Sequence, residues 1–224
     1  MSGGGCGTGA LSQAIIHACR PKQLSCVDPS AEFLAKAEER HLQNTNFIIG
    51  SASKIPAPGA TVDIVVSGLA LNFFSDLAVA FSEMKRVLKP GGTIAAYVWD
   101  YSGKMEFLRF FWDTAREIDT AAYQLDEGNR FPICNAEILQ QTFLNAGLTN
   151  VVSLNLDINT VFKNFNDYWY PFLGGQGPAP SYLASLSAEN QKQLHSAIHK
   201  KLPVEPDGSI KLVARAIAIQ GKLR

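Results

Sequence analysis

The chain has 224 residues, of which 46% are hydrophobic and 18% charged, and its formal net charge is zero. This length suffices for one globular domain with a full core, and the balanced charge gives no reason to expect nucleic acid or an anionic membrane as partner. No leader-like region and no apolar run of ~20 residues is evident, so we expect a cytoplasmic protein. Its four cysteines lack metal-type spacing, which predicts reduced thiols.

The first half of the chain alternates short apolar runs with amphipathic patterns. Strands are predicted at 23–28, 46–50, 62–68 and 93–100, and helices at 30–42 and 75–92. Residues 62–68 are apolar on both faces, which is typical of a central parallel strand covered by helices. Ser30 is placed to cap the first of these helices, and Pro90 with Gly91 closes the second. The alternation predicts an α/β fold, a three-layer αβα sandwich with a mostly parallel sheet.

The second half is less regular. Helices are predicted at 105–118, 136–148 and about 187–202, and strands at 150–162 and 210–221. These two late strands are placed to pair with each other, which predicts an antiparallel last strand. Residues 162–183, rich in aromatic residues, glycine and proline, are predicted to form a lid-like loop. Its aromatic side chains either pack in the core or line a binding site: Tyr168, Trp169, Tyr170 and Phe172.

A glycine loop near the start of the chain leads directly into a predicted helix. Gly5, Gly7 and Gly9 let the backbone approach a ligand, and the helix offers its positive end. Asp28 follows Gly9 by 19 residues, at the end of the next predicted strand, where a carboxylate can accept both hydroxyls of a ribose. Ala10 stands where dinucleotide-binding proteins favour a third glycine, but alanine is tolerated there. NAD therefore remains an alternative ligand.

Four segments resemble successive motifs of class I S-adenosylmethionine-dependent methyltransferases: GCGTGALS, VDPSAEFL, GSASKIPAPGATVDIVVSGLALNFF and LKPGGTIAAYVWD. They are most similar to the methyltransferase type 11 group, which includes quinone-biosynthesis C-methyltransferases. The resemblance covers roughly the first 100 residues. It implies a Rossmann-like sheet, S-adenosylmethionine as cofactor and methyl transfer as reaction. It also implies one domain over 1–224, with a cofactor-binding half at 1–100 and a substrate-side half at 101–224.

The resemblance assigns cofactor-binding roles to residues of these motifs. The glycine loop with Cys6 would wrap the methionine part of the cofactor, Asp28 would bind the ribose, and Pro29 and Ser30 would lie beside the adenine. Ser51 and Ala52 stand where the family often has Asp-Ala, whose carboxylate contacts the adenine amino group. The residues expected around the sulfonium are Ser67, Gly68 and Leu69.

One departure from the family pattern concerns the segment before the glycine loop. The family has a strand there that ends in an acidic residue, whereas Gly3 holds that place here. The resemblance therefore implies that the N-terminal helix and the first strand are lacking. Because each buried unpaired backbone group costs about 1–3 kcal/mol, we expect a fragile fold unless another segment or a second subunit, as in a homodimer, fills the gap.

No catalytic residue is identified from the sequence. Asn72, Trp99, Asp100 and Tyr101 lie at predicted strand ends, where Asp100 is either a base or a loop anchor. His195 and His199 are four residues apart on one helix face, but no third ligand accompanies them, so we expect no metal site.

The sequence thus favours S-adenosylmethionine-dependent methyl transfer to a small, apolar or aromatic acceptor, without nucleic-acid or membrane partners. Two alternatives stay open. Gly3, Ser51 and the missing strand favour an impaired or non-catalytic cofactor-binding domain that acts through a partner. An NAD-dependent oxidoreductase is the third reading, which the downstream motifs disfavour.

Overall fold

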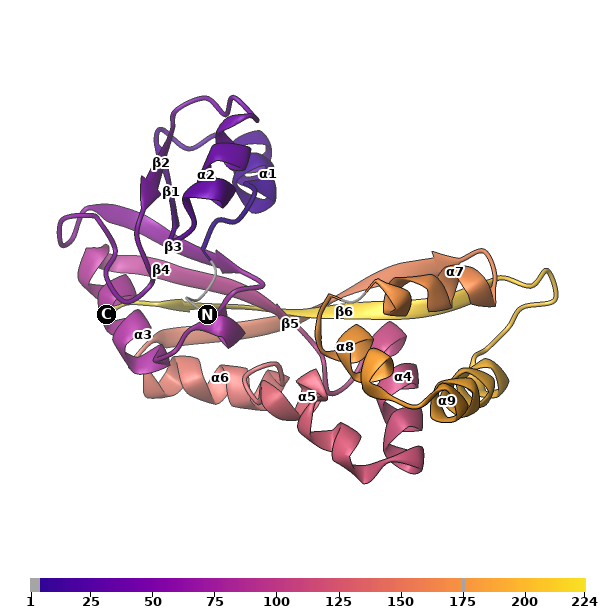
Figure 1. The fold of residues 1–224 in the computed structure, drawn as a ribbon. Helices are drawn as coiled ribbons and strands as arrows, with labels where there is room; N and C mark the ends of the chain where they lie inside the picture. Colours follow the sequence, from indigo (N-terminus) through magenta and orange to yellow (C-terminus); the bar gives the residue numbers. More distant parts are fainter. Residues whose placement is uncertain (1–4, 175) are drawn as a thin grey trace. The chain divides into compact units, whose positions relative to one another are not determined.

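The computed structural model describes residues 5–174 and 176–224, which divide into two compact units (Figure 1). The first unit comprises Met1–Val98, Glu137–Leu154 and Ala218–Arg224. The second comprises Trp99–Ala136 and Asn155–Ile217. The assignment of all 224 residues to one domain stays a prediction. No helix within the described residues is long and apolar enough to cross a membrane.

A small parallel sheet with two helices forms one part of the first unit. Its elements are α1 (Ala10–Cys19), β1 (Leu24–Asp28), α2 (Ala31–Glu38) and β2 (Thr45–Ile49). The two strands pair in parallel, with Leu24 opposite Thr45 and Asp28 opposite Ile49. Ser30 caps α2 by accepting a hydrogen bond from the Phe33 N–H at 3.2 Å, as predicted. The indigo end of the ribbon shows α1 and α2 beside these strands (Figure 1).

A four-stranded sheet carries the rest of the strands, in the order β3-β4-β6-β5. Its strands are β3 (Val62–Gly68), β4 (Leu88–Trp99), β5 (Thr149–Phe162) and β6 (Ile210–Lys222). β3 pairs with β4 in parallel. The Leu223 N–H donates to Gly92, and the Asp100 N–H donates to Arg215, so β6 runs antiparallel to β4. The predicted pairing of the two late strands and the antiparallel last strand are confirmed.

The prediction that residues 62–68 form a central strand of the sheet is wrong. Although β3 has the predicted bounds, it lies at the edge of its sheet, and the side chains of Ile64 and Val66 are 59% and 41% exposed. No strand among the described residues joins β1 to β3, so the strands form two separate sheets. Gly3, which the sequence places before the glycine loop, lies outside the described residues.

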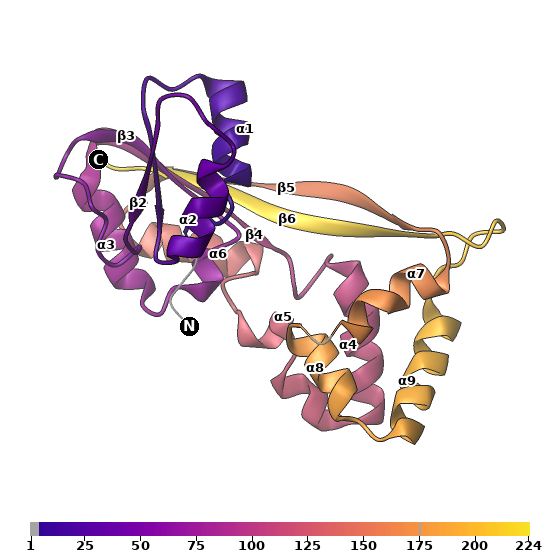
Figure 2. The same cartoon turned by 45° about the horizontal axis from the view of Figure 1, so that its top comes forward.

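Helices α3 (Leu77–Val87) and α6 (Ala136–Asn145) pack together in the first unit (Figure 2). The ring of Phe81 meets the ring of Phe143 edge-on, with 5.1 Å between centroids. Asp76 caps α3 through the Val79 N–H at 3.0 Å, one residue later than the predicted helix start. Contrary to the prediction, residues 88–92 belong to β4 rather than to the end of the helix.

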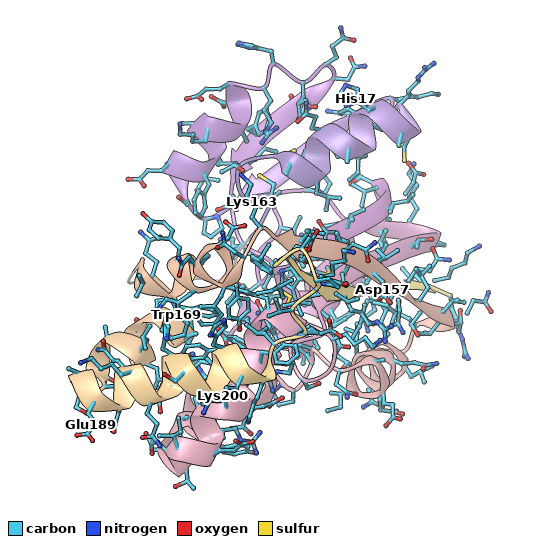
Figure 3. All side chains as sticks on the ribbon, turned by 90° about the vertical axis from the view of Figure 1, so that its right-hand side faces the viewer. His17, Asp157, Lys163, Trp169, Glu189 and Lys200 are labelled. Atoms are coloured by element: carbon cyan, nitrogen blue, oxygen red, sulfur yellow. The ribbon has the colours of Figure 1, made fainter. Side chains whose placement is uncertain are left out.

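The second unit is mainly helical. Its helical elements are α4 (Glu106–Ile118), η2 (Thr120–Gln124), α5 (Glu127–Arg130), α7 (Phe165–Trp169), η3 (Tyr170–Leu173), α8 (Pro178–Ser185) and α9 (Ala188–Lys201). Its core is built around stacked aromatic rings: Phe111 lies 4.5 Å from Phe172 between ring centroids. The buried Tyr168 hydroxyl donates to the Phe107 carbonyl at 2.8 Å. Figure 3 shows Glu189 and Lys200 toward opposite ends of α9.

The loop predicted at 162–183 is wrong over most of its length. Helical turns form there because their aromatic side chains are anchored in the core: Tyr168, Trp169 and Phe172 are buried, whereas Tyr170 is exposed. The Trp169 ring also meets the His195 imidazole edge-on at 5.0 Å, and Figure 3 shows Trp169 on the side of its helix that faces α9. A lid role for this segment stays a prediction.

Candidate functional site

The glycine loop is folded onto the carboxylate of Asp28. The Gly5 and Gly7 N–H groups donate to Oδ2 of Asp28 at 3.0 and 2.8 Å. The Ser30 N–H donates to Oδ1 at 2.9 Å. Asp28 is only 1% exposed, so these charge-assisted hydrogen bonds compensate for the removal of its charge from water. They fix the loop, the end of β1 and the start of α2 in one arrangement.

Glycine is required in the loop for two different reasons. A Cβ on Gly5 would lie 2.1 Å from the Val27 carbonyl oxygen, so only a residue without a side chain fits there. Gly7 and Gly9 have φ angles of 55° and 79°, in the left-handed region where other residues are strained. The Cys6 N–H donates to the same Val27 oxygen at 2.9 Å, which ties the loop to β1.

Two cysteine thiols lie together beneath the loop. The half-buried Cys6 and the buried Cys26 lie close enough for each to shift the pKa of the other, and the Cys26 thiol donates to the Ser12 hydroxyl at 3.0 Å. The hydrogen bond with Cys6 lowers the pKa of Cys26 to about 7. The same hydrogen bond, together with burial, raises the pKa of Cys6. All four cysteines are free thiols.

A cavity of about 650 Å³ opens at the carboxyl ends of β1 and β2. Its wall includes Pro29, Gly50, Ser51, Lys54, Glu83 and Arg86. The structure therefore brings Pro29 and Ser51 to one cavity, as their predicted common role requires. Ala52 is half-buried beside Ser51. Ligand cavities of this size that gather at strand ends are the usual binding sites of α/β folds.

Ser67 and Gly68 end β3 next to α1, and Leu69 follows the strand. A Cβ on Gly68 would lie 2.8 Å from the Leu11 side chain, so glycine permits this close approach. Leu69 has a left-handed φ of 53°, which costs free energy and is typical of functional positions. Ser67 is 8% exposed, and its hydroxyl has no hydrogen-bond partner among the described residues. These three residues do not contribute to the wall described for the cavity.

Asp28 has fewer free hydrogen-bond acceptor positions than its predicted role in ribose binding requires. A carboxylate offers about four lone-pair positions, and three N–H groups already occupy Asp28. About one position remains for a ribose hydroxyl in this arrangement. Binding both hydroxyls requires the loop to release at least one of its N–H groups.

The sequence candidates for chemistry have different surroundings. Asp100 accepts hydrogen bonds from the Gly103 and Lys104 N–H groups at 2.9 and 3.0 Å, so its carboxylate anchors a turn. Burial raises the pKa of Tyr101 to about 12, which keeps its hydroxyl protonated at neutral pH. The Asn72 amide nitrogen is buried and has no hydrogen-bond partner among the described residues. Trp99 ends β4 and is half-buried.

The second unit holds two buried carboxylates that the sequence did not single out. Trp112 donates its indole N–H to Glu127 at 2.5 Å, and Arg109 forms an ion pair with Asp126 at 2.5 Å. Burial raises the pKa of Glu127. Another cavity of about 510 Å³ in this unit is lined largely by ionic side chains, including Asp113, Arg116 and Glu117.

The histidine pair of α9 packs against aromatic rings. His195 and His199 lie 4.7 and 4.3 Å from the Phe165 ring between centroids. Burial lowers the pKa of His195, so the neutral imidazole is favoured. Within the described part of the chain, no three potential ligands gather in a way that could hold a metal ion.

Comparison with known proteins identifies the first part of the chain. Residues 4–96 match the family model described as "Methyltransferase domain". This segment is a class I methyltransferase domain. A malonyl-[acyl-carrier protein] O-methyltransferase from Pectobacterium atrosepticum is 37% identical over 91 residues, 41% of this chain and 35% of the relative. The ubiquinone/menaquinone biosynthesis C-methyltransferase UbiE from Rubrivivax gelatinosus is 32% identical over 107 residues, 48% of this chain and 41% of the relative.

Solved structures share the fold of this protein over nearly the whole chain. The YcgJ protein from Bacillus subtilis has a TM-score of 0.58 at 21% identity, covering 98% of this chain and 89% of that one. Phosphoethanolamine N-methyltransferase 2 from Haemonchus contortus, in complex with S-adenosyl-L-methionine, has a TM-score of 0.56 at 16% identity. That likeness covers all of this chain and 49% of the other. By sequence, the matched region spans little more than a third of the curated relatives.

The cavity also has wall residues that sequence reasoning missed. Lys54 belongs to the segment after Ser51, and Glu83 with Arg86 lies on α3. The only signal for the latter two was the spacing of opposite charges three residues apart on one helix face.

Proposed function

We propose that the chain binds S-adenosylmethionine and transfers its methyl group to a small, apolar or aromatic acceptor. The observation that supports this best is the glycine loop held by Asp28, next to a cavity at the ends of β1 and β2. The resemblance to methyltransferases assigns the cofactor to this loop and this acidic residue. The buried Ser67 hydroxyl, which no described residue hydrogen-bonds, is a further polar group suited to a ligand.

The residues present fit this cofactor. Gly5, Cys6, Gly7 and Gly9 would surround its methionine part, and Asp28 would accept a ribose hydroxyl. Pro29, Ser51 and Ala52 would lie at the adenine, and Ser67, Gly68 and Leu69 near the sulfonium. The bound cofactor supplies an electrophilic methyl group for in-line displacement. The contribution of the protein is then to position the acceptor and exclude water, so it needs no general base unless the acceptor must lose a proton.

The acceptor class rests on weaker support. Relatives named as malonyl-[acyl-carrier protein], quinone and thiol methyltransferases differ in acceptor atom. Most aromatic side chains of residues 162–183 are buried in the core of the second unit, so an apolar or aromatic acceptor stays a proposal made from the sequence. We infer a small molecule because the chain carries no net charge that would attract a polymer of one sign.

Calorimetric titration with S-adenosylhomocysteine tests the proposal, with NADH as the control ligand. Micromolar binding of S-adenosylhomocysteine without binding of NADH supports it. NADH binding alone would indicate an oxidoreductase instead. A folded protein that binds neither ligand would contradict the proposal and favour a domain that acts through a partner.

A further inference from the structure

Two charged side chains of α3 are bonded to the segment that forms one wall of the cavity. Arg86 donates from Nη1 to the Ala57 carbonyl and from Nη2 to the Ile55 carbonyl, each at 2.9 Å. Glu83 accepts the Ile55 N–H at 3.0 Å through Oε2. Three hydrogen bonds therefore connect residues 55–57 to one helix.

The same two side chains are bonded to each other. Arg86 Nε and Nη2 donate to the two carboxylate oxygens of Glu83 at 2.8 and 2.9 Å. This bidentate geometry fixes both groups, and only a planar guanidinium can satisfy it while also reaching two carbonyls. The hydrogen bond with Arg86 lowers the pKa of Glu83, so the carboxylate stays ionised at neutral pH.

The segment that contains residues 55–57 has little regular structure of its own. Residues 51–61 lie between β2 and β3 and contain no helix or strand. Further backbone hydrogen bonds lead the segment into β3: the Ala60 N–H donates to the Arg86 carbonyl and the Thr61 N–H to the Val87 carbonyl, each at 2.9 Å. Four residues of the segment line the cavity: Ser51, Lys54, Ile55 and Pro56.

We propose that Glu83 and Arg86 are positioning residues, which hold the 51–58 segment in the shape that binds the adenine side of the cofactor. This inference rests on the proposed function. We call the hydrogen bonds from Glu83 and Arg86 to residues 55–57 the clamp. Without it, the segment must become ordered when the cofactor binds, and the entropy cost of this ordering lowers the affinity. The clamp therefore sets cofactor affinity without taking part in the methyl transfer.

The test compares Arg86→Lys and Glu83→Gln with the parent chain by calorimetric titration. Lysine keeps the charge of Arg86 but cannot form its bidentate hydrogen bonds to Glu83 while also reaching two carbonyls. We therefore expect the dissociation constant for S-adenosylhomocysteine to rise about tenfold. Adenosine, which lacks the amino-acid part, should lose affinity by the same factor. Hydrogen exchange of the Ile55 amide should accelerate in Glu83→Gln, because its hydrogen bond to the carboxylate is weakened.

Lys85→Met is the matched control. Lys85 is the neighbour of Arg86 on α3, but its ammonium group donates to the Ala146 carbonyl at 2.7 Å rather than to the clamped segment. This variant should lose stability without losing cofactor affinity.

The outcomes separate this inference from the proposed function. If the parent chain binds no S-adenosylhomocysteine, both fail. If the parent chain binds and Arg86→Lys binds equally well, the clamp is overturned while the proposed function stands. An equal loss of affinity in Lys85→Met would also overturn the clamp, because it would trace the loss to general destabilisation.

Discussion

The Gly7 N–H donates to the buried carboxylate of Asp28 at 2.8 Å, so the acidic residue at the end of β1 holds the glycine loop in place. The Gly5 N–H shares the same oxygen. This relationship makes Asp28 a structural residue as well as a proposed cofactor ligand.

Replacing Asp28 with Asn should weaken both folding and cofactor binding. An amide has one acceptor oxygen, and its NH2 group would oppose a backbone N–H donor. We expect the free energy of unfolding to fall by about 2–3 kcal/mol, measured by urea denaturation, with a parallel loss of S-adenosylhomocysteine affinity. The exposed Asp63, which pairs with Lys89, provides the control: Asp63→Asn should leave both quantities unchanged. Unaltered stability of Asp28→Asn would show that the loop does not depend on the carboxylate.

Gly5→Ala should disrupt the loop, because its Cβ would lie 2.1 Å from a backbone oxygen that cannot move aside without breaking β1. Gly91→Ala is a suitable comparison. Gly91 has a φ of 77° but no atom within 4 Å of an added Cβ, so only the left-handed backbone is penalised, at about 1–2 kcal/mol. We expect loss of S-adenosylhomocysteine binding in Gly5→Ala and full binding in Gly91→Ala. Equal binding by both variants would contradict the loop geometry.

Glu127 should make stability depend on pH. Its side chain is 7% exposed, and burial raises its pKa above the ordinary value of 4.5. A carboxyl with a raised folded-state pKa contributes fully to stability below its unfolded-state pKa, and this contribution is lost as pH rises through the folded-state pKa. Glu127→Gln carries no charge to bury. Its thermal midpoint should therefore rise relative to that of the parent chain as the pH rises above 4.5.

Calorimetric melting curves of both proteins over this pH range measure the effect of Glu127. Glu38→Gln, at the exposed end of α2, should follow the parent curve. If the Glu127→Gln curve also runs parallel to the parent curve, ionisation of Glu127 does not cost folding free energy.

Asp100→Ala separates a loop anchor from a catalytic base. The anchor role predicts a loss of about 1–2 kcal/mol in the free energy of unfolding, because two N–H bonds to the carboxylate disappear. The methyl-transfer rate per folded molecule, and its pH profile, should stay unchanged. A rate that falls with loss of the acidic limb of the pH profile, along which a base becomes active by losing its proton, would instead assign the base to Asp100.

Local patterns were sufficient to place most elements. The β-branched residues of β3 predicted both of its ends, and Ser30 was recognised as a cap because its role depends only on the next three residues. The pairing partners of β3 depend on chain segments far away in sequence, so its edge position could not be read from Val62–Gly68. The helices at 165–185 were missed because glycine and proline suggest loops, whereas burial of aromatic rings decides the structure there.

The candidate site was predictable to a similar extent. Motif order predicted a common site for Asp28, which ends β1, and Ser51, which follows β2, and it placed the glycine loop at the start of α1. The partners of Asp28 were not predictable, because a carboxylate at that place can face either a ligand or the backbone. The bonds from Arg86 to Ile55 and Ala57 span about thirty residues of sequence and follow only from the fold.

The separation of the described strands into two sheets has a consequence for cooperativity. No strand pairing ties β1 and β2 to β3 within the described residues, so we expect the segment from the glycine loop to β2 to open as a foldon of its own, below the global free energy of unfolding. Asp28 and the glycine loop belong to this foldon. A bound ligand would then act as its missing stabiliser, and the measured affinity would include the free energy of closing it.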